Sequence, residues 1–98
     1  MPAWTLQELR ARRAELLAAA TRRGARRVRV FGSVARGDSQ PSSDVDFVVQ
    51  FDVGRSLLDH GGLQMDWQEL LGCRVDVVSE KSLRDRMRQN VERDAVDL

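Results

Sequence analysis

The stretch FGSVARGDSQPSSDVDFVVQF, residues 31–51, decides the fold and the chemistry of this 98-residue chain. Its glycine-serine pair, Gly32-Ser33, follows an apolar segment and leaves room for one short helical turn before Gly37. A glycine at such a junction lets the backbone approach an anion closely, and Ser33 adds a hydroxyl at the positive end of the helix. The pattern predicts a turn that holds a triphosphate.

The second half of this stretch, residues 44–51, has the alternation of a strand. One face is apolar and is expected to pack on the core; it carries Val45, Phe47, Val49 and Phe51. The opposite face is expected to look outward; it carries Asp44, Asp46, Val48 and Gln50. Because Asp44 and Asp46 project from one face, they can share divalent cations that prefer hard oxygen ligands, and magnesium is the natural candidate.

A later strand, residues 74–79, repeats this orientation, with Val75 and Val77 facing the core and Asp76 pointing away. If the two strands pair side by side, Asp76 completes a cluster of three carboxylates that can hold one or two Mg²⁺ ions. Asp76 is then either a third metal ligand or the general base that activates an attacking hydroxyl.

Helices are expected around these strands. Thr5 and Glu8 form a capping-box pattern, and the apolar residues that follow keep helical spacing as far as Gly24. Residues 27–31 predict a first strand and residues 63–71 a helix ending at Gly72, and the four-residue spacing of Leu83, Met87, Val91 and Ala95 predicts a closing helix. The expected order is helix, strand, short helix, strand, helix, strand, helix, a small sheet of about three strands with about four helices.

The composition limits the alternatives. Sixteen basic residues against 15 acidic ones give a net charge of +1, so nothing favours direct binding of nucleic acid or a membrane surface. No apolar stretch approaches a membrane-spanning length, and the single cysteine, Cys73, cannot form an internal disulfide. We therefore expect one domain over residues 1–98, in the cytoplasm.

The spacing Gly32-Ser33, ten residues, then Asp44-x-Asp46 resembles the signature of the DNA polymerase beta type nucleotidyltransferase superfamily. Residues 57–79 also resemble its minimal nucleotidyltransferase (MNT) branch, so nearly the whole chain is covered. The resemblance implies an α/β (α+β) nucleotidyltransferase fold with a small mixed sheet. It also implies that Gly32, Ser33 and Arg36 contact the nucleotide, and that Asp44, Asp46 and Asp76 hold the metal and act in catalysis.

Members of this branch are antitoxins encoded beside HEPN-domain ribonuclease toxins, and some transfer AMP from ATP to a tyrosine of that toxin. The resemblance therefore implies a magnesium-dependent protein adenylyltransferase whose partner is a cognate HEPN toxin. Two alternatives stay open: an antitoxin that neutralises its toxin by binding alone, and a nucleotidyltransferase with another acceptor. Homo- and hetero-oligomers are both compatible with the sequence.

Other conspicuous residues have simpler interpretations. Arg36 can pair with Asp38 instead of a phosphate, and His60 has no second histidine or cysteine nearby for a transition-metal site. Two groups of basic residues are typical of solvated helix faces, although either could meet an acidic partner. They are the eight arginines between Arg10 and Arg29, and the run Lys81, Arg84, Arg86 and Arg88.

Overall fold

The computed structural model describes residues 3–98 and contains a four-stranded mixed sheet in the order β3-β2-β1-β4. The strands are β1 (Ala25–Phe31), β2 (Val45–Phe51), β3 (Val75–Ser79) and β4 (Val96–Asp97). The α-helices are α1 (Leu6–Ala11), α2 (Arg13–Arg22), α3 (Gly32–Arg36), α4 (Leu57–Leu71) and α5 (Asp85–Asp94), and a 3-10 turn covers Glu80–Ser82. No helix among these residues is long and apolar enough to cross a membrane.

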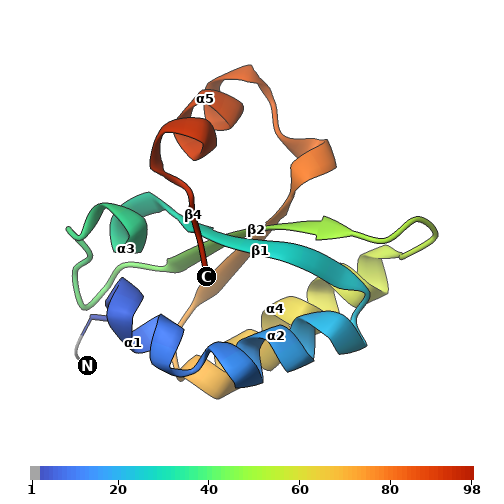
Figure 1. Ribbon diagram of the computed structural model, residues 1–98, viewed down its shortest axis with the longest axis horizontal. Helices are drawn as coiled ribbons and strands as arrows, with labels where there is room; N and C mark the ends of the chain where they lie inside the picture. The colour runs from blue at the N-terminus through green and yellow to red at the C-terminus, as the bar shows by residue number, and fades with distance from the viewer. Residues whose placement is uncertain (1–2) are drawn as a thin grey trace.

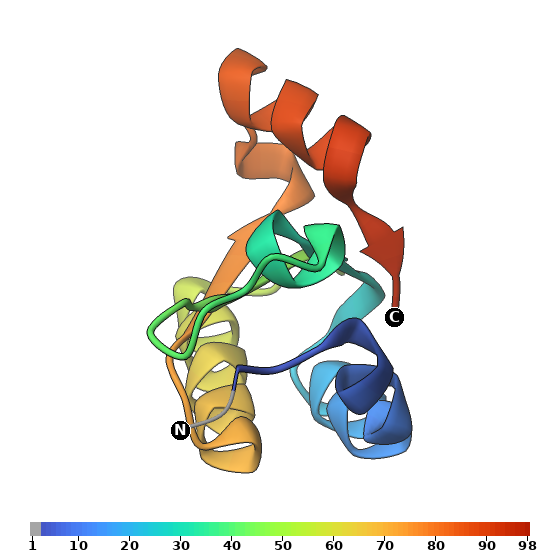
Figure 2. The same ribbon diagram turned by 90° about the vertical axis from the view of Figure 1, so that its left-hand side faces the viewer.

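The helices lie on both sides of the sheet. Figure 1 shows α1, α2 and α4 together on one side and α5 on the other, with α3 at one end of β1. Figure 2 shows α3 above the loop that leads into β2, with α5 higher still and α2 and α4 below. The predicted α/β class, with a small mixed sheet flanked by helices, is confirmed.

The strand pairing determines which residues become neighbours. Strands β1 and β2 are antiparallel, whereas β2 and β3 are parallel and are joined through α4. The C-terminal end of β1 therefore lies beside the N-terminal end of β2, and β3 starts at this same end of the sheet. Asp44, Asp46 and Asp76 all lie at this end.

The main core fills the space between the sheet and α1, α2 and α4. Phe47 and Trp67 are fully buried, and their ring centroids lie 4.3 Å apart. The Trp67 indole N–H donates to the Leu16 carbonyl over 3.0 Å, so this large ring is buried with its polar atom satisfied. Local signals delimit the helices here as predicted: Thr5 and Glu8 form the capping box of α1, and Gly72, with φ of 66°, ends α4.

A second, smaller core lies on the opposite face of the sheet, where the sequence predicted an outward-looking surface. Val48 is fully buried there against Phe31, Leu83 and Val91. The prediction was wrong for Val48 because the 3-10 turn and α5 fold back over this half of the sheet, and period-two alternation alone does not show such a cover.

The N-terminal helix is interrupted, contrary to the single helix predicted up to Gly24. Arg12 leaves helical geometry, with φ −107° and ψ 18°, and separates α1 from α2. Its guanidinium donates to the Leu70 carbonyl on α4 and pairs with Glu15. Arginines stand where the apolar stripe would continue after Leu9, so the chain turns there and both helices can still bury a leucine.

The C-terminal segment also differs from the prediction. The closing helix ends at Asp94, Ala95 is extended, and Val96–Asp97 form a fourth strand that pairs with β1 at Arg29 and Val30. Leu83 precedes the helix and Met87 is 42% exposed, so the predicted four-residue stripe is not one continuous buried face. Two residues of strand are too few for a periodicity signal.

Candidate active site

The strand register brings two of the predicted carboxylates together. Asp46 on β2 is the direct neighbour of Asp76 on β3. Asp76 is exposed between buried Val75 and Val77, so it points away from the main core, on the same side as Asp46. The two strands therefore pair in the way that a shared carboxylate site requires.

Gly32 lies on the other side of Asp46. Phe31, the last residue of β1, pairs with Asp46, and Gly32 follows with φ of 73°. A Cβ atom on residue 32 would lie 2.3 Å from Asp46 Oδ2, which is far inside contact distance. Both the backbone conformation and the approach of the carboxylate require glycine here.

Ser33 follows at the start of α3 and is half-buried. No side chain of the described residues caps this helix start, and the first N–H groups of a helix have no acceptor within the helix. The structure places Gly32, Ser33, Asp46 and Asp76 in one continuous band across three neighbouring elements.

The electrostatics of Asp46 identify the site as deficient in positive charge. Burial, together with the negative charges of Asp76 and Asp44, raises the pKa of Asp46 from 3.8 to about 6, against a smaller opposing effect of Arg36. An ionised carboxylate is therefore costly at this position unless a cation joins it. A set of carboxylate oxygens with excess negative charge fits a hard divalent cation such as Mg²⁺.

Asp44 lies just before β2 and is turned toward the start of β3. Its carboxylate pairs with Arg74, with 3.3 Å between Arg74 Nε and Asp44 Oδ1. Among residues 3–98, no three acidic, histidine or cysteine side chains are already gathered as a metal-binding group. The Arg74 side chain is 84% exposed, and an ion pair of this kind contributes about 0–1 kcal/mol, so Asp44 can turn toward Asp46 at little cost.

Arg36 is engaged by two carboxylates of the protein itself. It pairs with Asp38 and with Asp94, each over 3.3 Å, and hydrogen bonds to both raise the pKa of Arg36. Asp94 also pairs with Arg93, and these contacts lower the pKa of Asp94. Arg36 thus links α3 to α5, while its positive charge still lowers the pKa of Asp46. A phosphate that bound Arg36 would share the guanidinium with Asp38 and Asp94.

Sequence analysis did not single out Arg74 or Asp94. For Arg74 a signal existed, because Asp44-Val45-Asp46 and Arg74-Val75-Asp76 are equivalent triplets on two strands, and parallel pairing places residue 74 beside residue 44. For Asp94 none existed, since its contact with Arg36 spans 58 residues and depends on how α5 folds back.

A hollow of about 220 Å³ adjoins Asp44. Its wall includes the Trp4 ring, whose N–H donates to the Leu71 carbonyl over 3.1 Å, together with Pro41 and Arg74. Cys73 also lines it, and burial raises the pKa of its thiol. Of the predicted site residues, only Asp44 lines this hollow.

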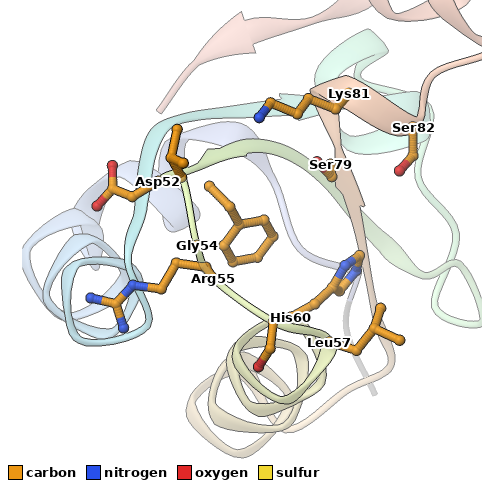
Figure 3. Close-up of a pocket in the computed structure, with 11 residues that line it drawn as sticks. Asp52, Gly54, Arg55, Leu57, His60, Ser79, Lys81 and Ser82 are labelled. Carbon is orange, nitrogen blue, oxygen red and sulfur yellow. The ribbon is translucent and has the colours of Figure 1, made fainter.

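A larger hollow, about 510 Å³, lies at the other end of β2 around Phe51, five residues and about 17 Å along the strand from Asp46. Figure 3 shows His60 and Ser79 on one wall and the Asp52 to Arg55 loop on another. His60 is half-buried, stacks near Phe51 and lies 2.6 Å from the Val77 carbonyl, so it joins α4 to β3. This hollow contains none of the predicted site residues.

A glycine-serine turn beside paired carboxylates on a mixed sheet is the arrangement of a nucleotidyl-transferring enzyme, and comparison with known proteins agrees. The chain belongs to the nucleotidyltransferase domain family, whose pattern matches residues 13–98. Protein adenylyltransferase MntA of Thermococcus cleftensis is 41% identical over 73 residues, which are 74% of this chain and 74% of that protein.

Solved structures agree on the fold. A structure assigned provisionally to the minimal nucleotidyltransferases superposes with a TM-score of 0.85 at 52% identity and covers 97% of both chains. A complex of a tri-AMPylated Shewanella oneidensis HEPN toxin with an MNT antitoxin matches with a TM-score of 0.69 at 16% identity, over 90% of this chain and 69% of that chain. The predicted resemblance to the minimal branch is confirmed.

Proposed function

We propose that this chain is a magnesium-dependent protein adenylyltransferase that transfers AMP from ATP to a hydroxyl of a cognate HEPN toxin, with tyrosine as the acceptor, and thereby neutralises the toxin. Two comparisons support the proposal: the MntA relative is named for this reaction, and the Shewanella oneidensis complex contains an AMPylated HEPN toxin with an MNT antitoxin. ATP as the donor and the free Cys73 thiol support a cytoplasmic location as part of this proposal.

The observation that carries the proposal is the order of the site across the sheet. Gly32 lies on the β1 side of Asp46, and Asp76 lies on its β3 side. A donor triphosphate beside Gly32 and an acceptor hydroxyl beside Asp76 would approach Asp46 from opposite sides. In-line transfer needs the attacking and leaving oxygens on opposite sides of the phosphorus, and this order supports such an arrangement.

Each residue then has a role that its position allows. The Gly32 backbone would lie close to the phosphates, and the Ser33 hydroxyl would donate a hydrogen bond to a phosphate oxygen. Asp44 and Asp46 would hold Mg²⁺, with Asp76 as third ligand or as base. Magnesium, when bound, neutralises the charge of the triphosphate and lowers the pKa of the attacking hydroxyl.

The reaction joins the acceptor oxygen to the α-phosphorus and breaks the bond from that phosphorus to pyrophosphate. The proton of the acceptor hydroxyl passes to Asp76 when Asp76 acts as the base. β3 is an edge strand and Asp76 is exposed, so a protein acceptor can reach it without any rearrangement of the sheet.

Incubation of the chain with radiolabelled ATP, Mg²⁺ and the product of the neighbouring gene tests the proposal. We expect label on that product and a mass gain of whole AMP units, both lost by at least about 100-fold in Asp46→Asn. Glu92→Gln, an exposed change on α5, is the matched control and should transfer normally. An unlabelled product with every nucleotide, alongside full neutralisation by Asp46→Asn, would instead establish an antitoxin that acts by binding alone.

A further inference from the structure

We infer that the outer face of α4 is the contact surface through which two copies of this chain pair, with the two α4 helices antiparallel. The exposed positions of this 15-residue helix form one stripe, here called the α4 stripe, made of Leu57, Leu58, Gly61, Met65 and Glu69. Leu57, Leu58 and Met65 are 87%, 84% and 70% exposed. A helix face that looks into water is normally polar, and a continuous apolar stripe marks an interaction site.

Gly61 in the middle of the α4 stripe supports a close approach of another backbone. A glycine inside a helix costs about 1 kcal/mol relative to alanine, so its presence needs a reason. For its neighbour Gly62 the reason lies within the chain, because a Cβ on residue 62 would lie 2.5 Å from the Arg23 guanidinium carbon. A Cβ on Gly61 would meet nothing within 4 Å. The fold itself therefore does not require glycine at position 61, whereas a helix packed across it would.

The α4 stripe is complementary to itself. A twofold axis through Gly61 places Leu57 and Leu58 of one copy against Met65 of the second, and the reverse contact follows by symmetry. The same axis brings Glu69, the one charged residue of the stripe, near Arg55 of the second copy. Arg55 is 41% exposed on the loop before α4, where its side chain covers the Gly24 backbone and makes a surface pair with Asp59 at 3.6 Å. A partner of opposite polarity is thus present in the chain itself.

The expected dimer is weak and leaves both active sites open. An α4 helix is about 22 Å long, so its stripe covers less than the roughly 800 Å² per partner of a standard stable interface. The stripe begins beside the hollow of Figure 3, where Leu57 lies on the rim, at the end of β2 remote from Asp46. Pairing through α4 therefore does not cover the carboxylates, and it does not depend on the proposed transfer reaction.

Sedimentation equilibrium of the purified chain over roughly 5 to 500 µM tests the inference. We expect a monomer–dimer equilibrium in the wild type, weakened at least about tenfold in Leu58→Glu. Residue 58 is in the first turn of α4, where an acidic side chain suits the helix dipole, so this variant should fold normally. Met87→Glu replaces an exposed apolar residue on α5 and should dimerise like the wild type.

Two further variants separate packing from charge. Gly61→Gln should raise the melting temperature by a few degrees while weakening the dimer, a combination that general destabilisation cannot produce. Glu69→Lys should weaken the dimer most at low salt, and Glu92→Lys on α5 should not. A chain that is monomeric at every concentration overturns the inference, as does unchanged association of Leu58→Glu. Loss of binding only to the neighbouring gene's product would assign the stripe to that protein instead.

Discussion

The two faces of β2 show how one strand serves stability and chemistry at once. On the face toward α2 and α4, Val45, Phe47 and Val49 are at most 1% exposed, and burial alone explains them. On the other face, Val48 is equally buried, yet its neighbour Asp46 bears a carboxylate in a half-buried place that raises its pKa to about 6. The first face stabilises the fold by burial. On the second face, the Asp46 carboxylate is unfavourable by itself and can bind a cation.

Removal of the Phe47 ring is the largest disturbance of the stabilising face. Phe47→Ala should lower the free energy of unfolding by about 3–5 kcal/mol, because the lost ring contacts Trp67 and leaves a cavity in the main core. Val48→Ala, one residue along in the smaller core, should cost less, about 1–3 kcal/mol. Urea unfolding of both variants measures the difference, and equal losses would contradict a division into a main and a minor core.

On the face of β2 that carries Asp46, the next largest expected effect is that of adding a methyl group at Gly32. Gly32→Ala should cost about 1–3 kcal/mol of stability, because residue 32 has φ of 73° and its Cβ would displace the Asp46 carboxylate. Gly37→Ala is the matched control: φ is 81° there, but no atom lies within 4 Å of a Cβ. Nucleotide affinity, measured by calorimetry with Mg²⁺ and ATP, should fall only for Gly32→Ala, and an equal fall in both would remove the special role of the Asp46 contact.

Neutralisation of Asp46 should stabilise the metal-free protein. The pKa of Asp46 lies above its ordinary value in the folded state, so the folded state binds this proton more tightly, and stability falls as pH rises from about 4 through 6. A change from 3.8 to about 6 corresponds to at most about 3 kcal/mol, and partial exposure reduces this to about 1–2 kcal/mol.

Asp46→Asn should therefore be more stable than the wild type at pH 7–8 in EDTA by that amount, and equally stable near pH 4. Added Mg²⁺ should stabilise the wild type and not the variant. Thermal unfolding across this pH range measures both effects, and a variant less stable than the wild type at pH 8 would refute an unfavourable charge at this site.

The smallest expected effect concerns the pair that holds Asp44. Arg74→Gln should change stability by less than about 0.5 kcal/mol, since the Arg74 side chain is 84% exposed. Because Arg74 competes with a cation for Asp44, the affinity for Mg²⁺ alone should rise about two- to fivefold. Titration of Mg²⁺ in the absence of nucleotide tests this, and weaker binding would mean that Arg74 orders Asp44 for the metal.

Local signals in the sequence predicted much of this molecule. Alternation in residues 44–51 and 74–79 assigned Asp46 and Asp76 to the faces they occupy, whereas Asp44 precedes β2 and pairs with Arg74. The capping box of α1 and the glycine after α4 delimited helices correctly. The glycine-serine turn also lies where a strand meets a short helix, as its composition required. These features depend on neighbours within a few residues, so the chain itself contains the information.

Only the tertiary structure decided which residues become neighbours on adjacent strands and across the faces of the sheet. The parallel register of β2 and β3 sets Asp76 beside Asp46 and Arg74 beside Asp44. The return of α5 buries Val48 and links Arg36 to Asp94. Side-chain period fixes the face of a residue but not its cross-strand neighbour, because the neighbour follows from packing between segments tens of residues apart.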